Sequence, residues 1–151
     1  MLALKNITKS FNKTKVIDNL SLEINRGDRI AILGSNGCGK STLLKIILGL
    51  LKADSGLINK ENMLIGYASQ NSRSFYMRLT AHDNLFFFSS IYAKRKSKEI
   101  KSRINNYANL LNITNLLSKQ MFDLSKGEMQ KIIFLRSLIN DPELLLFDEA
   151  F

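Results

Sequence analysis

The feature that most constrains the fold is a glycine-rich run of nine residues between a buried-strand pattern and a helix pattern. The apolar residues 30–33 precede the run, and an apolar helix pattern follows from Leu43. Glycine lets backbone amides turn toward one point without obstruction by a Cβ atom, and the positive end of the following helix attracts an anion. The run therefore predicts a phosphate-binding loop and the binding of a nucleoside triphosphate. Its members are Gly34, Ser35, Asn36, Gly37, Cys38, Gly39, Lys40, Ser41 and Thr42.

Two side chains of this loop have predicted individual roles. We expect the Lys40 ammonium to reach the β- and γ-phosphates and the Ser41 hydroxyl to bind Mg²⁺. A glycine-rich turn before a helix also occurs where no nucleotide binds, so the prediction gains its weight from further motifs in the chain.

Composition narrows the class of protein. A chain of 151 residues with 45% hydrophobic and 23% charged residues is typical of one soluble globular domain. The single cysteine, Cys38, excludes an internal disulfide, and the sequence has no Cys/His cluster of the zinc-binding kind, so the expected compartment is the reducing cytoplasm. No apolar run is long enough for a signal peptide or a membrane span.

The net charge is +9 and the isoelectric point is near 9.8, which would suit nucleic acid or an anionic membrane surface. The lysines are scattered, however, and the one dense basic run, at 94–98, lies between two helix patterns, where a solvated connector explains it. We therefore expect no nucleic-acid partner.

The N-terminal half has strand patterns on both sides of one helix pattern. Apolar and polar residues alternate over 16–25, which predicts a half-buried strand that Ile17 and Asp18 interrupt. Residues 2–8 are expected to pair with it antiparallel, through a connection near 12–15. The other expected elements of this half are a turn at 26–28, a buried strand ending at Leu33, a well-packed helix over about 40–50, and short strands at 56–59 and 63–68.

The C-terminal half is predicted to be mainly helical. Thr80 has the character of a helix cap and Asp83 lies in the first turn, so a helix is expected from there to about residue 92. Ser125 and Glu128 have the spacing of a capping box, which opens a helix that ends near 139. The remaining expected elements are a helix from about 97 to 111 and a buried strand of the parallel type at 144–147.

Two adjacent carboxylates, Asp148 and Glu149, follow that last apolar strand. Asp148 is predicted to hold Mg²⁺, directly or through water, and Glu149 to orient and deprotonate the attacking water. An apolar run followed by two acids is often only a strand leaving the core. Together with the phosphate-binding loop, the pair becomes specific.

The segment 124–128, Leu-Ser-Lys-Gly-Glu, resembles the signature motif of ATP-binding cassette (ABC) ATPases, whose common form is Leu-Ser-Gly-Gly-Gln. The resemblance extends over the whole chain. It implies ATP and Mg²⁺ as cofactors, Phe11 as the aromatic that stacks on adenine, and Gln70 as the glutamine that senses the γ-phosphate and Mg²⁺.

The fold class that the resemblance implies is α/β, a P-loop cassette with an N-terminal antiparallel part, a mixed or parallel core sheet and a helical subdomain. We expect 1–151 to be one partial ATPase domain. Within it, the expected nucleotide-binding core comprises 1–70 and 140–151, and the helical signature subdomain comprises about 71–139.

In that family the signature of one subunit binds the ATP held by another, so a second ATPase subunit, by default a homodimer partner, is implied. Ser125, Gly127 and Glu128 would then be the signature residues that bind the opposing subunit's ATP, with Ser125 and Gly127 presenting a hydroxyl and amides to its γ-phosphate. The chain departs from the common motif at Lys126 and Glu128, and the capping box explains Glu128 as well as a contact with nucleotide does.

Residues 73–85 are similar to the corresponding region in ATPase subunits of bacterial exporters of drugs, antibiotics and polysaccharides. The resemblance therefore implies an integral membrane permease as partner, export as the direction, and a place on the inner face of the cell membrane. Phe75, Tyr76 and the Phe residues at 86–88 could line the permease groove, although such a stripe is more often core. The alternatives are a soluble ABC ATPase acting on ribosomes or nucleic acid, and a fragment that binds nucleotide without hydrolysing it.

The chain stops two residues after Glu149. After that point the family has a loop that links to the partner subunit, a switch histidine, and the strand that carries this histidine. In the sheet of the family, that strand lies between the strand that precedes the phosphate loop and the strand that precedes Asp148. We therefore expect a longer natural protein, and expect residues 1–151 alone to be inactive as an ATPase.

Overall fold

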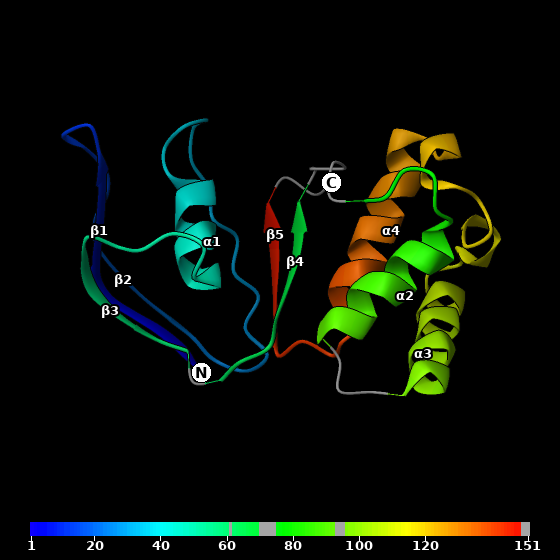
Figure 1. The fold of residues 1–151 in the computed structure, drawn as a ribbon. Helices are drawn as coiled ribbons and strands as arrows, with labels where there is room; N and C mark the ends of the chain where they lie inside the picture. Colours follow the sequence, from blue (N-terminus) through cyan, green and yellow to red (C-terminus); the bar gives the residue numbers. More distant parts are fainter. Residues whose placement is uncertain (61, 70–74, 93–95, 149–151) are drawn as a thin grey trace. The chain divides into compact units, whose positions relative to one another are not determined.

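The computed structural model describes residues 1–60, 62–69, 75–92 and 96–148 (Figure 1). The chain divides into two compact units, an N-terminal unit (Met1–Met63) and a C-terminal unit (Leu64–Phe151). The predicted division into a core of 1–70 and 140–151 and a helical part of 71–139 stays a prediction. No helix in the described part of the chain is long and apolar enough to cross a membrane.

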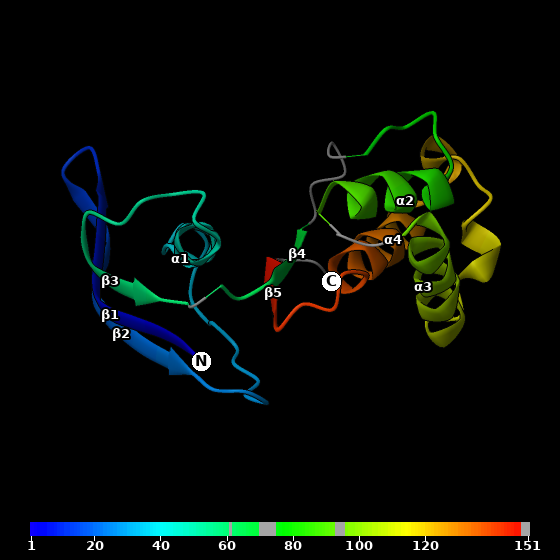
Figure 2. The same ribbon diagram turned by 60° about the horizontal axis from the view of Figure 1, so that its bottom comes forward.

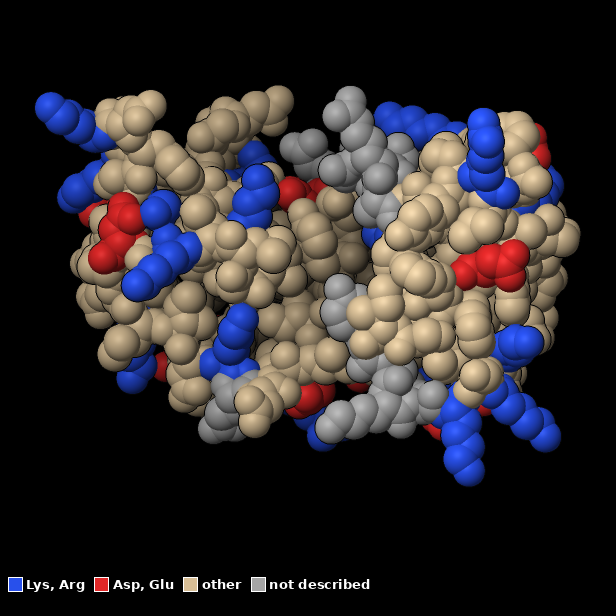
Figure 3. Space-filling model, in the orientation of Figure 1, with Lys and Arg blue, Asp and Glu red and all other residues tan. Residues whose placement is uncertain are grey.

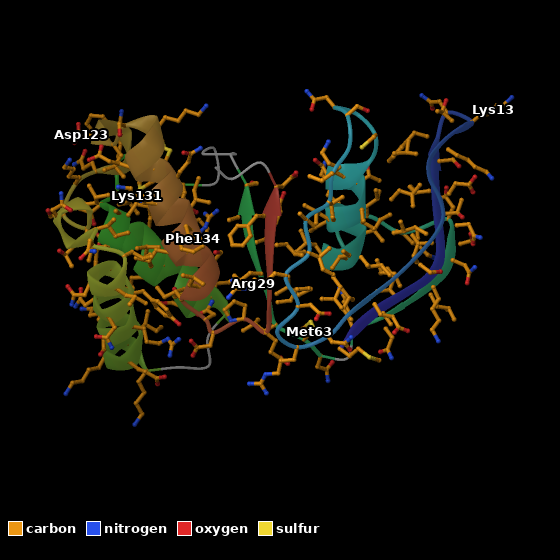
Figure 4. All side chains as sticks on the ribbon, turned by 180° about the vertical axis from the view of Figure 1, so that it is seen from behind. Lys13, Arg29, Met63, Asp123, Lys131 and Phe134 are labelled. Atoms are coloured by element: carbon orange, nitrogen blue, oxygen red, sulfur yellow. The ribbon has the colours of Figure 1, made fainter. Side chains whose placement is uncertain are left out.

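The N-terminal unit contains a three-stranded antiparallel sheet in the order β2-β1-β3, formed by β1 (Leu2–Phe11), β2 (Thr14–Ile24) and β3 (Ser55–Asn59). The predicted antiparallel pair is confirmed, and its turn consists of Asn12 and Lys13, both at positive φ. Two such residues give a hairpin turn whose twist matches that of the flanking strands. Figure 4 shows Lys13 at the tip of this hairpin.

The first helix, α1 (Lys40–Leu48), lies beside one face of this sheet (Figures 1 and 2). Leu43, Leu44, Ile46 and Ile47 are buried, as the pattern of the helix predicted. The helix ends at Leu48 and is capped by Gly49, whose left-handed backbone lets its amide donate to the carbonyl of Ile46. The apolar side of the sheet and this helix therefore form the core of the N-terminal unit.

The prediction of a buried strand that ends at Leu33 is wrong. Residues 28–35 have no regular secondary structure, and Ile30 and Leu33 are 47% and 89% exposed. An extended segment forms a strand only when neighbouring strands pair with its amides and carbonyls, and a continuous apolar run also needs cover on both faces. Among the described residues no strand pairs with this segment, so its apolar side chains remain at the surface.

The C-terminal unit contains a parallel pair of strands, β4 (Ile65–Ser69) and β5 (Leu144–Asp148), which aligns Ser69 with Asp148. Both strands were predicted to within about two residues. The expected burial of β5 is only partly met, because Leu146 is buried whereas Phe147 is 40% exposed beside Phe134 of the preceding helix. Figure 4 labels Phe134 on that helix.

Three helices connect these strands, α2 (Ala81–Tyr92), α3 (Ser97–Leu110) and α4 (Lys126–Leu138), with short 3₁₀ turns η2 (Thr114–Leu116) and η3 (Met121–Asp123) before α4 (Figure 2). All three helices were predicted with nearly these bounds. Their apolar faces meet in one core, and its most buried members include Leu85, Ile104, Met121, Ile132 and Leu135. This packing holds the start of α4, where the signature-like motif lies.

Candidate nucleotide-binding site

The glycine-rich loop leads from the irregular segment 28–35 into the first turn of α1. Gly39 has φ of +105°, and a Cβ atom there would lie 2.8 Å from Cγ1 and 2.9 Å from the carbonyl oxygen of Val16 on β2. Another residue at this position would therefore be strained and would also clash with the strand. The loop shape depends on glycine at the point where the helix begins.

The Lys40 side chain folds back over the loop. Its Nζ donates hydrogen bonds to the carbonyl oxygens of Gly34 and Ser35, both at 2.8 Å, and lies 3.9 Å from Cys38 Sγ. Two neutral acceptors thus hold the ammonium group against the loop. A phosphate anion is a stronger partner for an ammonium than a neutral carbonyl, so an incoming triphosphate would compete well for this group.

The first turn of α1 is suited to an anion. Its N-cap, Gly39, offers no side-chain acceptor to the first amides of the helix, and no acidic residue lies in the first turn. Ser41 is the second residue of this turn. A cavity of about 220 Å³ adjoins the loop, lined by Val16, Ile17, Asp18, Leu20, Ile32, Leu33, Cys38, Gly39, Lys40 and Leu43. The loop, its lysine and this helix end fit the phosphates of a nucleoside triphosphate.

Phe11 is the last residue of β1, and its ring is 45% exposed. The ammonium of Lys9 lies 5.5 Å from the ring centroid and is also paired with Asp54 at 2.6 Å. A half-exposed ring next to a fixed cation can stack on a purine base. The adenine-stacking role of Phe11 stays a prediction.

Asp148 lies at the end of β5 in the C-terminal unit. Tyr67 of β4 donates a hydrogen bond from its hydroxyl to Asp148 Oδ2 at 3.3 Å. Burial, and then the charge of Asp148, raise the pKa of Tyr67, so the hydroxyl remains a donor that orients the carboxylate. Sequence reasoning missed Tyr67. The feature that identifies Tyr67 is the parallel pairing of β4 with β5. This pairing aligns Ser69 with Asp148, and Tyr67, two residues before Ser69, lies on the same face of the sheet as Asp148.

The two other predicted groups of this region, Gln70 and Glu149, lie outside the described residues. Their roles in sensing the γ-phosphate and in activating water stay predictions.

The signature-like motif forms the start of α4, and the predicted capping box is confirmed. Ser125 Oγ accepts from the amide of Glu128 at 3.2 Å, and Glu128 Oε2 accepts from the amide of Ser125 at 2.9 Å. No described atom lies within 4 Å of the position that a Cβ atom on Gly127 would take. The protein itself therefore leaves space at Gly127, and a need for glycine there would have to come from a bound ligand or partner.

Glu128 also forms an ion pair with Lys119, at 2.9 Å between Nζ and Oε1. Hydrogen bonds from Lys119 and then from Ser125 lower the pKa of Glu128 to about 2. The carboxylate is thus engaged on both oxygens. Lys119 was missed in the sequence because it lies nine residues before Glu128 and outside its helix, so no periodic spacing connects them.

The chain resembles known proteins in sequence and in fold. A protein-family model described as "ABC transporter" matches residues 17–151. The chain is 32% identical to an uncharacterized ABC transporter ATP-binding protein, YhaQ, of Bacillus subtilis, covering 100% of the chain and 53% of the relative. It is 34% identical to the zinc import ATP-binding protein ZnuC of Ehrlichia ruminantium, covering 96% of the chain and 58% of the relative. The chain thus spans little more than half the length of these relatives.

The chain is also similar in fold to solved structures. The chain matches cbiO1 of Clostridium perfringens, part of the ABC transporter complex cbiONQ, with a TM-score of 0.84, 26% identity, and coverage of 97% of the chain and 64% of the solved one. It matches a nucleotide-free ATP-binding cassette from an ABC transporter with a TM-score of 0.83, 28% identity, and coverage of 100% and 69%.

Proposed function

The chain belongs to the ABC transporter family, and on that premise we propose that it binds and hydrolyses ATP as the ATPase subunit of a membrane transporter. Its fold is that of an ABC ATPase cassette. The observation that carries the proposal is the loop at 34–42, where Lys40 is folded over the loop carbonyls at the uncapped start of α1.

In the proposed mechanism the loop amides and Lys40 bind the phosphates, and Phe11 stacks on adenine. Ser41 and Asp148 would hold Mg²⁺, whose charge offsets that of the phosphates. Tyr67 keeps the Asp148 carboxylate in one orientation through its hydrogen bond. Glu149 takes the proton of the attacking water, and Gln70 responds to the γ-phosphate.

We further propose a homodimer in which ATP is bound by the loop of one copy and by the signature of the other. Ser125 and the amide of Gly127 would contact the γ-phosphate in trans. The space around Gly127 supports this, because nothing in the described chain crowds that position. Glu128 acts from within the chain, as the reciprocal partner of Ser125.

The permease is proposed to dock on residues 76–80, which we call the docking segment. Tyr76 is 53% exposed, and Met77 and Leu79 are also exposed. Tyr76 packs against Phe87 with ring centroids 5.2 Å apart, whereas Phe75 is buried and lies under the guanidinium of Arg136 at 4.2 Å. Of the aromatic residues predicted to line a groove, Tyr76 and Phe87 are thus available to a partner, and Phe75 belongs to the core.

The direction of transport is proposed to be export, on the similarity of residues 73–85 to exporter subunits. A specific observation favours import as the second candidate, namely the 34% identity to a protein described as a zinc import ATP-binding protein. Through its permease the subunit would lie at the inner face of the cell membrane.

A soluble ABC ATPase acting on ribosomes or nucleic acid remains the alternative outside transport. Such partners favour a concentrated basic surface. Figure 3 instead shows Lys and Arg side chains dispersed over the visible face, with Asp and Glu among them.

Copurification of the full-length protein from membranes of its own cells tests the proposed function. With a tagged subunit we expect a polytopic permease to be recovered in stoichiometric amount, identified by mass spectrometry. Tyr76→Ala with Met77→Ala should reduce that recovery, and Leu110→Ala, at an exposed leucine on α3, serves as the control. Recovery of ribosomes or nucleic acid in place of a permease would contradict the proposal.

A further inference from the structure

The docking segment is attached along its length to the chain that leads into the signature motif. Residues 77–82 and 117–122 run side by side and exchange backbone hydrogen bonds, and we call this pairing the ladder. Its bonds join the amide of Met121 to the carbonyl of Leu79 at 3.0 Å, Phe122 to Met77 at 3.1 Å, Ala81 to Lys119 at 2.9 Å and His82 to Leu117 at 3.0 Å, with an antiparallel bridge between Thr80 and Gln120. A displacement of the docking segment would therefore move residues 117–122 with it.

A buried asparagine fixes the shape of the docking segment. Asn84, fully buried on α2, accepts from the amide of Tyr76 at 2.8 Å. Its amide group donates to the carbonyls of Tyr76 and Thr80, both at 3.0 Å. The segment is thus held as a stiff turn.

Lys119 connects the ladder to the signature. Its backbone carbonyl accepts from Ala81, the first residue of α2, and its side chain donates to Glu128 in the capping box of α4. Glu128 in turn holds the amide of Ser125. Lys119 therefore belongs to the ladder through its backbone and contacts the signature through its side chain.

We propose that Lys119 is a positioning residue that transmits movement between the docking segment and the signature motif through its ion pair with Glu128. This inference rests on the proposed function for the identity of the partner, a permease at residues 76–80. The physical link itself is contained within one chain. Because the glutamate replaces the glutamine of the common motif, the charged form of this link is a property of this sequence.

The structure allows the ion pair to be removed without removing the other contacts. Lys119→Ala leaves the backbone bond to Ala81 and the capping box in place. Glu128→Gln keeps a side chain that suits the N3 position of a capping box but removes the charge that pairs with Lys119. The matched control is Lys131→Ala, which changes an exposed lysine on α4, the helix that also contains Glu128 (Figure 4).

The first arm of the test uses the isolated full-length protein and needs no permease. Hydrogen exchange is measured with and without Mg²⁺-ATP, and we expect ATP to slow exchange of the amides of Ala81, His82, Met121 and Phe122 by about threefold to tenfold in the wild type and in Lys131→Ala. In Lys119→Ala and in Glu128→Gln the slowing should be confined to the start of α4. The double variant should show no further loss, because both changes break one contact. Equal slowing of the ladder amides in Lys119→Ala would overturn the inference.

The second arm uses the complex with the copurified permease in lipid nanodiscs. Lys119→Ala should retain the basal ATPase rate of the isolated subunit but lose about threefold or more of its stimulation by the permease. An equal loss of basal and stimulated rates would show a merely structural role and overturn the inference. If no permease stimulates the wild type while the first arm gives the expected result, the proposed function fails and the link within the chain stands.

Discussion

At the scale of single residues, nucleotide binding is predicted to depend on Lys40. Its ammonium is the side-chain cation held over the phosphate loop, by carbonyls that a phosphate would replace as partners. We predict that Lys40→Ala weakens ATP binding by about tenfold to a hundredfold, the effect of losing a charge-assisted hydrogen bond. Isothermal calorimetry on the full-length protein measures this, with Lys131→Ala as the control. Unchanged affinity of Lys40→Ala for ATP would show that Lys40 does not bind the nucleotide.

Glu149 is the residue on which hydrolysis is predicted to depend. Glu149→Gln should retain Mg²⁺-ATP binding, because the loop and Lys40 are intact, while the rate of hydrolysis falls by about 10²-fold or more for lack of a general base. Phosphate release and nucleotide affinity are measured on the same preparation. A rate near that of the wild type would assign the base to another group.

The Glu128 carboxylate is expected to make the stability of the folded protein depend on pH. Its pKa is lowered from 4.5 to about 2 in the folded protein, chiefly by Lys119. The ionised carboxylate therefore stabilises the fold above pH 4.5, and this contribution is lost as the pH falls toward 2. The melting temperature of the wild type should exceed that of Glu128→Gln at pH 7, and the difference should shrink below pH 4.5. A difference that does not change with pH would show that the charge of Glu128 is unimportant.

At the scale of the elements, Asn84 has the largest predicted effect on stability. Asn84→Ala would leave the amide and carbonyl of Tyr76 and the carbonyl of Thr80 without their side-chain partner. The two carbonyls still accept from the backbone amides of Leu79 and Asn84, whereas the amide of Tyr76 loses its acceptor. One unsatisfied group costs about 1–3 kcal/mol, so we expect the free energy of unfolding to fall by about 1–3 kcal/mol. Urea unfolding of the full-length protein measures it, and Asn105→Ala, at an exposed position on α3, should change it by less than about 0.5 kcal/mol. Similar values for the two variants would contradict the role of Asn84.

The elements that could be predicted from the sequence are those whose structure is determined by residues adjacent in the sequence. The hairpin at Asn12 and Lys13 and the capping box at Ser125 each depend on a few adjacent residues, and both formed as predicted. The strand ending at Leu33 did not form, because a strand needs hydrogen-bonding neighbours that its own sequence cannot supply. Lys119 and Tyr67 were missed for a related reason, since each reaches its partner only through the tertiary fold.

At the scale of the whole molecule, the nucleotide motifs are distributed between the two units. The phosphate loop belongs to the N-terminal unit, and Asp148 and the signature motif belong to the C-terminal unit. The proposed mechanism joins the loop of one copy to the signature of a second copy. The proposed dimer therefore requires that ATP brings two copies together through Gly127.

Light scattering of the full-length Glu149→Gln protein, with and without Gly127→Ala, measures whether ATP joins two copies in this way. Alanine meets no described atom within 4 Å at this position and favours the helix by about 0.5–1 kcal/mol, so the fold should not suffer. We predict that Mg²⁺-ATP converts Glu149→Gln into a dimer with one ATP per chain, whereas the double variant binds ATP but remains a monomer at the same concentration. An equally stable dimer of the double variant would show that no partner nucleotide approaches Gly127, and the proposed dimer would be wrong.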